Sequence, residues 1–259
     1  MTESCSAKKD ACTMVSFETD YGKITVKLYP ETPKHRDNFL KLVKDGFYNG
    51  VLFHRVIPEF MVQTGDPNSK TAKAGNSLGS GDVGYTIPAE FVYPKYYHKR
   101  GALAAARQGD QTNPLKASSG CQFYFVQGRA FSDAELNTME KNNEQKLEGK
   151  LFQDILKTKQ EEVKQFRSDR DQVKLDLLRD SILTQVRAQM KADPSFKFTE
   201  QQRNDYKTLG GTPHLDGDYT VFGEVTEGLD VVDKLSQTKT GRNDRPVEDI
   251  HIIKATCKE

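Results

Sequence analysis

One short run of the chain combines a cation, large apolar side chains and an amide. Arg55, Phe60, Met61 and Gln63 fall within nine residues. Alternate side chains of a strand share a face, so Met61 and Gln63 should point the same way, and Arg55 on the neighbouring strand should reach over the same patch. The pattern predicts an apolar surface with a guanidinium and a hydrogen-bonding amide at its rim. The alternative is an ordinary strand with Phe60 and Met61 in the core.

Other kinds of catalytic site have no matching pattern in the sequence. The five histidines lack the spacing of metal ligands, and no GxSxG, P-loop or Gly-rich dinucleotide turn is present. We therefore expect no metal and no cofactor, and a chemistry that needs no nucleophile. Strand alternation should turn His54 away from the face of Arg55, which favours a structural role. Cys121 is expected to be a small buried apolar residue.

The segments around this run are typical of short strands and two helices. Residues 14–19 and 23–29 alternate apolar and polar side chains and predict a hairpin. A helix should follow, with Thr32 as N-cap, Pro33 at its first position and Gly46 just past its end. Further strands are predicted at 51–56, 60–64, 101–106, 121–127, 219–225 and 250–255, and a second helix at 229–236. Many short strands with two helices predict a mainly β fold, a closed or nearly closed barrel.

Residues 132–208 differ in composition from the rest of the chain. They contain one Gly, one Pro, 15 Lys or Arg and 15 Asp or Glu. Apolar residues recur at helical spacing, in one series from Leu147 to Phe166 and a second from Val173 to Met190. This predicts one long helix or a pair of antiparallel helices that ends before Pro194. The segment is either a solvated insertion or an arm that binds a partner or client.

Whole-chain composition excludes several classes of protein. The net charge of +1 over 259 residues leaves no electrostatic footprint for nucleic acid, and no apolar run is long enough to span a membrane. The N-terminal residues do not form a signal peptide as they stand, which favours the cytoplasm. Export or lipid anchoring in the periplasm is the alternative, if a leader has been removed. A Cys5–Cys12 disulfide is possible in an oxidising compartment.

The run FHRVIPEFMVQTGDP, at residues 53–67, resembles the signature of the cyclophilin family of peptidyl-prolyl cis-trans isomerases. Further segments resemble the same family in the same order: residues 32–39, GALAAA at 101–106, SSGCQFY at 118–124, HLDG at 214–217 and YTVFGEV at 219–225. The pattern is most similar to bacterial members. The resemblance implies an eight-stranded antiparallel barrel capped by two helices, formed by residues 14–131 and 209–259. Residues 1–13 would then be an N-terminal tail and 132–208 a helical insertion.

The resemblance also implies a set of site residues. Arg55 would be catalytic, and ten further residues would bind substrate: Phe60, Met61, Gln63, Ala106, Arg107, Gln122, Tyr124, His214, Leu215 and Tyr219. Four of these depart from the usual family pattern. Arg107 stands where eukaryotic members commonly carry Asn, Tyr124 replaces a Phe, His214 stands where many members have Trp, and Tyr219 where many have His. The Tyr124 hydroxyl would need a hydrogen-bond partner.

The implied activity is cis-trans isomerisation of X–Pro bonds in peptides and in unfolded or folding chains. Uncatalysed exchange takes roughly tens to hundreds of seconds. Arg55 would stabilise the twisted bond while the apolar residues hold the proline ring. Two other functions remain open: a proline-peptide binding module or chaperone with little turnover, and an interaction protein whose helical insertion makes the contacts.

Overall fold

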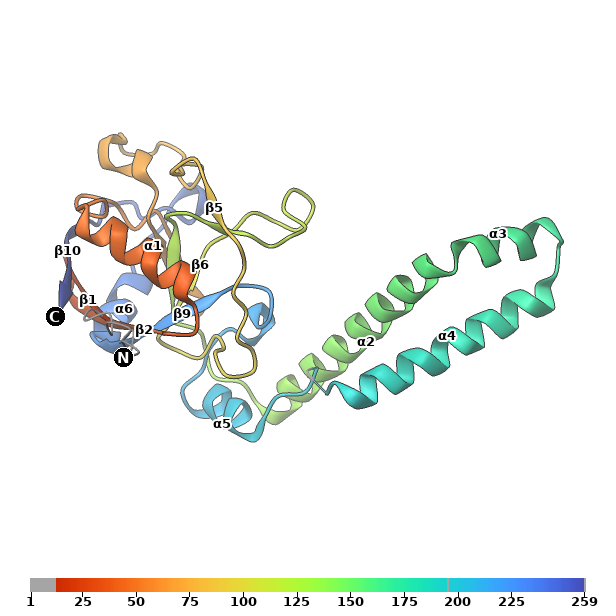
Figure 1. Cartoon of the computed structure of the whole chain (residues 1–259). Coiled ribbons are helices and arrows are strands. Elements are labelled where there is room, and N and C mark those ends of the chain that lie inside the picture. Colours follow the sequence, from red (N-terminus) through yellow and green to blue (C-terminus); the bar gives the residue numbers. More distant parts are fainter. Residues whose placement is uncertain (1–12, 195, 259) are drawn as a thin grey trace, which may run out of the picture. The chain divides into compact units, whose positions relative to one another are not determined.

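An eight-stranded antiparallel sheet is the main element of the computed structural model, which describes residues 13–194 and 196–258 (Figure 1). The strand order is β10-β1-β2-β9-β6-β8-β4-β3. These strands are β1 (Met14–Thr19), β2 (Gly22–Leu28), β3 (Arg55–Ile57), β4 (Met61–Thr64), β6 (Ala102–Ala105), β8 (Phe123–Val126), β9 (Val221–Glu227) and β10 (Ile252–Lys258). Two short strands, β5 (Thr86–Ile87) and β7 (Ser118–Ser119), pair separately.

Backbone hydrogen bonds link the two edges of this sheet. Just before β3, the Phe53 amide donates to the Ile250 carbonyl at 2.9 Å, and the Ile252 amide of β10 donates to the Val51 carbonyl at 2.8 Å. The sheet therefore curls into a barrel. The prediction of a mainly β, antiparallel, eight-stranded fold is confirmed.

Alternation along the strands separates a core from an outer face. Val56, Val62, Leu103, Phe123 and Phe125 belong to one buried cluster with the inward residues of β1, β2 and β10. Met61, Ala104 and Tyr124 alternate with them and belong to a second cluster. Since successive side chains of a strand point to opposite faces, the second cluster lies on the other side of the same strands.

Two helices have the predicted positions. Helix α1 (Pro33–Lys44) begins at Pro33, and Gly46 follows it with a φ of 68°, where a β-carbon would be strained. Its buried side includes Phe39, Leu42 and Val43. Thr32 is the N-cap by position, but its hydroxyl donates to the Tyr29 carbonyl rather than capping a helix amide. Helix α6 (Leu229–Ser236) coincides with its prediction.

The chain divides into two compact units. One contains the described residues up to Ala130 and from Asp205 onward, and the other is Phe131–Asn204. The second unit contains α2 (Asp133–Thr158), α3 (Gln160–Ser168) and α4 (Gln172–Ala192). Helix α4 runs back along α2 and α3, so the segment is a helical hairpin rather than one helix. Helix α5 (Glu200–Thr208) crosses the boundary between the units.

The second apolar series predicted for this segment is wrong in its first half. Val173 and Leu177 are exposed, whereas Ile182 and Val186 are buried. The half-buried positions before Ile182 are Leu175 and Leu178. Val173 and Leu177 are each two positions from the half-buried Leu175. Residues two apart on a helix do not share a face, so these two side chains lie on the solvent side of α4.

Several smaller features differ from the predictions or lie beyond them. The segment after β4 contains a 3-10 turn, η1 (Pro67–Thr71), and two further turns are η2 (Pro213–Leu215) and η3 (Arg242–Asp244). Cys5 and Cys12 lie outside the described residues. Within the described ranges, no helix has both the length and the apolar composition needed to cross a membrane.

Candidate active site

Cross-strand register places Arg55, Gln63 and Tyr124 in one row. Arg55 of β3 opposes Gln63 of β4, and Gln63 opposes Tyr124 of β8. Residues directly opposite in antiparallel strands share a face. The neighbouring row, which includes Val62 and Phe125, points into the core. The chain thus brings a guanidinium, an amide and an aromatic ring together on the outer face of the barrel.

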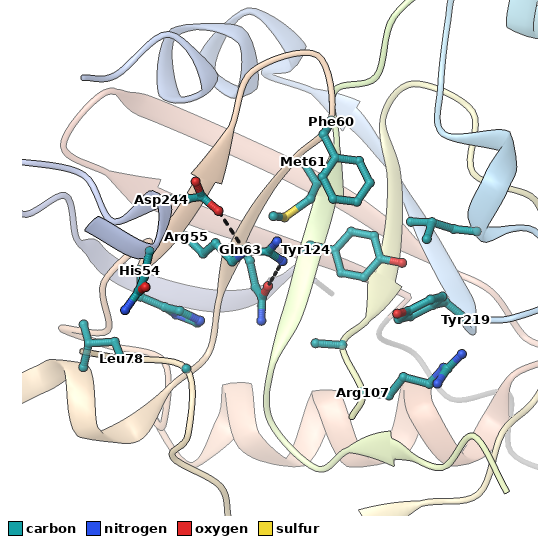
Figure 2. Close-up of a pocket in the computed structure, with 14 residues that line it drawn as sticks. His54, Arg55, Phe60, Met61, Gln63, Leu78, Arg107, Tyr124, Tyr219 and Asp244 are labelled. Atoms are coloured by element: carbon teal, nitrogen blue, oxygen red, sulfur yellow. Dashed lines mark hydrogen bonds and ion pairs between the residues drawn. The ribbon is translucent and has the colours of Figure 1, made fainter. Parts of the chain in front are cut away.

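A cavity of about 460 Å³ opens over this row. Figure 2 shows the residues that line it. They come from β3, β4 and β8, from positions that flank β3, β4 and β6, from the loop at 78–79, from the segment at 215–219 and from the turn at 243–244. Nine predicted site residues line the cavity: Arg55, Phe60, Met61, Gln63, Ala106, Arg107, Tyr124, Leu215 and Tyr219. Only Gln122 and His214, among the predicted residues, lie outside this lining.

Arg55 is held on two sides. Its Nη1 donates to Gln63 Oε1 at 3.5 Å, and its Nε lies 3.5 Å from Asp244 Oδ2 (Figure 2). The Arg55 side chain keeps 43% of its surface exposed. The guanidinium is therefore oriented, yet its remaining N–H groups stay accessible to a molecule in the cavity.

A chain of amides continues from Gln63. Gln63 Nε2 donates to Gln122 Oε1 at 3.0 Å, and Gln122 Nε2 donates to the carbonyls of Gly79 at 3.0 Å and Gly81 at 2.7 Å. Gln122 lines a second cavity of about 610 Å³. Gln63, Gly79, Ala106 and Arg107 line both cavities, so the two are adjacent. An extended chain bound over Arg55 could continue into the second cavity.

Aromatic rings form the opposite end of the first cavity. The Phe60 ring stacks on His214, with centroids 5.4 Å apart, so His214 supports the wall without lining it. Tyr219 packs edge-on against Tyr124 at 6.1 Å. The Arg107 guanidinium lies 4.3 Å above the Tyr219 ring and donates to the Asp218 carbonyl at 2.7 Å. Arg107 therefore fixes a wall residue through a cation–π contact.

The hydroxyl of Tyr124 finds its partner beneath the cavity. It lies 3.0 Å from His98 Nε2, and His98 Nδ1 lies 2.9 Å from Asp216 Oδ1. Asp216 also accepts from the His98 amide at 2.8 Å and from the Tyr206 hydroxyl at 2.5 Å. The Asp216 carboxylate can only accept, so Nδ1 donates to it, and Nε2 is the ring nitrogen left to accept a hydrogen bond from the Tyr124 hydroxyl. Burial raises the pKa of Tyr124, so the phenol stays protonated.

Tyr124→Phe tests this arrangement. We expect the free energy of unfolding to fall by about 1–2 kcal/mol, because His98 Nε2 loses its partner in a buried site. Turnover should stay within about twofold, because the ring that lines the cavity remains. Chemical denaturation and peptide kinetics on the same preparation measure both effects. Unchanged stability would contradict the hydrogen bond to His98.

His54 has a more complex position than its sequence suggests. The side chain is 3% exposed, as a structural residue would be, and burial lowers its pKa to about 4. Its ring nevertheless borders the cavity beside Leu78 (Figure 2), and it also lies close to Gly79. Cys121 is buried, which raises its pKa to about 11. Across residues 13–194 and 196–258, no three His, Cys, Asp or Glu side chains are grouped to hold a metal ion.

Three residues of the site were not predicted as site residues. His98 and Asp216 approach Tyr124 from two loops, and Asp244 approaches Arg55 from a third. The extra hydroxyl of Tyr124 did predict a buried partner, but not its identity. Asp244 stands in an unremarkable polar stretch, and only the fold brings it to the cavity.

Comparison with known proteins agrees with this geometry. The family model described as cyclophilin type peptidyl-prolyl cis-trans isomerase/CLD matches residues 14–143 and 153–257. A Staphylococcus saprophyticus protein assigned as a peptidyl-prolyl cis-trans isomerase is 31% identical, over 91% of this chain and 87% of its own length. A Streptococcus pyogenes protein assigned as a bifunctional phosphatase/peptidyl-prolyl cis-trans isomerase is also 31% identical, over 92% of this chain but only 37% of its own length.

A solved structure shares the fold. It is a Cryptosporidium parvum cyclophilin type peptidyl-prolyl cis-trans isomerase in the presence of the dipeptide Ala-Pro, with a TM-score of 0.53 and 18% identity. The alignment covers 95% of this chain and 99% of that one. Sheet, cavity and family match lead to one assignment. The chain belongs to the cyclophilin-type family of peptidyl-prolyl cis-trans isomerases.

Proposed function

We propose that the chain accelerates rotation about X–Pro bonds with Arg55 as the group that stabilises the transition state. The observation that carries the proposal is the position of Arg55 beside a cavity with apolar walls. Phe60, Met61, Tyr124 and Leu215 line that cavity together with the guanidinium. A pyrrolidine ring fits such walls, and the bond to be turned would lie within reach of Arg55.

The physics of the reaction favours a cationic donor at that position. Resonance gives the peptide bond a rotation barrier of roughly 18–20 kcal/mol. At the midpoint of rotation the resonance is lost and the proline nitrogen carries a lone pair. A hydrogen bond from Arg55 to this nitrogen is stronger in the twisted state than in either planar isomer, which is the condition for catalysis. The step forms no covalent bond to the protein.

The residues before proline would be held by the amide chain and the second cavity. Gln63 and Gln122 are already fixed by hydrogen bonds to each other and to Gly79 and Gly81. Ala106 and Arg107 line both cavities. We assign these residues to positioning the substrate backbone, so that rotation of the held chain is converted into twisting of the X–Pro bond.

The substrates would be proline-containing peptides and unfolded chains. The Cryptosporidium relative was solved in the presence of Ala-Pro, which supports a short X–Pro peptide as a test substrate. Exposure of Arg55 supports access by a longer chain. A role in folding would follow wherever X–Pro isomerisation limits a folding rate.

Refolding kinetics test the folding role. A protein whose slow phase is set by a native cis-proline should lose that phase in the presence of catalytic amounts of this chain. The matched control is the same protein with the proline replaced, whose faster refolding should not change. Equal acceleration of both proteins would indicate a chaperone effect, and acceleration of neither would contradict a role in folding.

We infer that the helical unit is peripheral to peptide turnover. The residues on either side of it are paired: the Arg129 amide and carbonyl bond to the carbonyl and amide of Gly211, at 3.4 and 3.0 Å. Replacing residues 133–204 by a short Gly-Ser linker retains Tyr206 and its bond to Asp216. We expect kcat/KM on a short peptide to stay within about twofold, because no cavity residue is removed.

The same deletion separates the other possible functions of the helical unit. An arm that grips clients predicts weaker suppression of aggregation of a large unfolded protein, with peptide turnover intact. Loss of peptide turnover in a deletion variant that still shows cooperative unfolding would contradict a peripheral role for the helices.

A further inference from the structure

We propose that Asp244 is a positioning residue that orients the Arg55 guanidinium for catalysis. This inference rests on the proposed function of Arg55. Asp244 Oδ2 lies 3.5 Å from Arg55 Nε, and both side chains line the same cavity (Figure 2). The carboxylate meets the inner nitrogen of the guanidinium, whereas Gln63 takes one terminal nitrogen. The guanidinium is thus held from its base, and its other N–H groups face the cavity.

The backbone at Asn243 and Asp244 adopts the strained left-handed conformation. Asn243 and Asp244 have φ angles of 58° and 57°. The left-handed region disfavours residues with a β-carbon, although Asn and Asp tolerate it best. Two such residues in succession persist only where surrounding contacts hold them, and such positions cluster at functional sites. Without this turn conformation, the Asp244 side chain would leave the Arg55 position.

Contacts on the far side of the turn hold it in place. The buried Arg245 side chain donates from Nη1 to the carbonyls of Lys73 and Asn76, at 3.1 and 2.6 Å, and from Nη2 to Asp249 at 2.7 Å. Asn243 Nδ2 donates to Ser77 Oγ at 3.3 Å. The turn is thus anchored to the loop that precedes Leu78 and Gly79, which border the cavity. These contacts hold the turn in one conformation, and the turn in that conformation places Asp244 beside Arg55.

Arg55 needs such a support because it is half exposed. A long side chain with 43% of its surface in solvent retains many rotamers. Its contact with Gln63 is a single hydrogen bond at 3.5 Å, which leaves the rest of the guanidinium unrestrained. A second contact at Nε restricts the guanidinium to one plane before substrate arrives. The benefit should appear in kcat, because Arg55 is most useful when the bond is twisted.

Asp244→Asn and Asp244→Gly are the direct tests. Both residues suit the left-handed backbone, so the fold should not suffer: Tm should be unchanged or slightly raised. We expect kcat/KM on an Ala-Pro peptide to fall about three- to tenfold, from the loss of one ordered side chain. The fall should lie in kcat, with KM within about twofold. Asp45→Asn is the matched control, since Asp45, at the C-terminal end of α1, pairs with Lys41 at 3.1 Å and both side chains are exposed.

A second measurement separates positioning from a general effect. Lysine has no Nε donor at the same place, so Asp244→Asn should have less effect in an Arg55→Lys background than in the wild type. An equal factor in both backgrounds would overturn the proposal, as would wild-type or higher kcat in both Asp244 variants. If the wild type itself shows no turnover, the proposed function fails and this inference fails with it. Wild-type turnover with unaffected Asp244 variants overturns this inference alone.

Discussion

Arg55→Ala is expected to lower kcat/KM for an X–Pro peptide by about 10²–10³-fold, the usual effect of removing a preorganised donor from a developing charge. Arg55 Nη1 contacts Gln63 in the row beneath the cavity, which places the cation beside the bond to be turned. Since the apolar walls remain, most of the loss should appear in kcat. Steady-state kinetics on an Ala-Pro peptide measure it.

Stability provides the control for this substitution. Arg55 is half exposed and its two contacts are both 3.5 Å long, so its removal should change the free energy of unfolding by less than about 1 kcal/mol. Arg55→Lys keeps the charge but loses the planar fork and should fall between the wild type and Arg55→Ala. An Arg55→Ala protein that folds normally and retains a third or more of wild-type kcat/KM would contradict the proposed mechanism.

His98→Ala should cause the largest loss of stability, about 3 kcal/mol in the free energy of unfolding. The imidazole is 1% exposed and joins Asp216 to Tyr124. Its removal leaves two buried polar groups each short of a partner, at roughly 1–3 kcal/mol per group. Asp216 keeps the bond from Tyr206 and the His98 backbone amide, so the variant should still fold. Urea denaturation measures the change.

The chain contains a matched control for His98. His251 makes the same kind of contact, Nδ1 to Asp20 Oδ2 at 3.0 Å, but its side chain is 46% exposed. His251→Ala should cost less than about 0.5 kcal/mol, because exposed pairs contribute little. His98→Ala combined with Tyr124→Phe should cost less than the sum of the two single changes, since both remove the same hydrogen bond. Equal losses at His98 and His251 would contradict the buried network.

The sequence predicted the elements that carry the site because their signals are local. Alternation placed Met61 and Gln63 on one face, and punctuation by Pro33 and Gly46 marked the ends of α1. Both patterns depend on neighbours within a few residues. The register between strands depends on distant residues instead, since Gln63 pairs with Tyr124, 61 positions away. The predicted set came together only through resemblance to a family.

Contacts between loops could not be predicted from the sequence. Asp244 meets Arg55 from 189 positions away, and Asp216 meets His98 from 118. Asp216 lies in the HLDG segment that resembles the family, but nothing local in the sequence indicates its contact with His98, and nothing local marks Asp244. The two-residue strands β5 and β7 were missed for a related reason, since two residues are too few to show a period. Val173 and Leu177 show that a local pattern can also mislead. Their helical spacing is correct, but both side chains lie on an exposed face.

NMR exchange spectroscopy on an Ala-Pro peptide with catalytic amounts of the full chain tests the central claim most directly. The peptide shows separate cis and trans signals, because uncatalysed exchange takes roughly tens to hundreds of seconds. We expect cross-peaks between the two isomers within a mixing time of under a second, and their loss with Arg55→Ala. Shifted peptide signals without cross-peaks would show binding without turnover. That result would contradict the catalytic role of Arg55 and make the barrel a module that recognises proline.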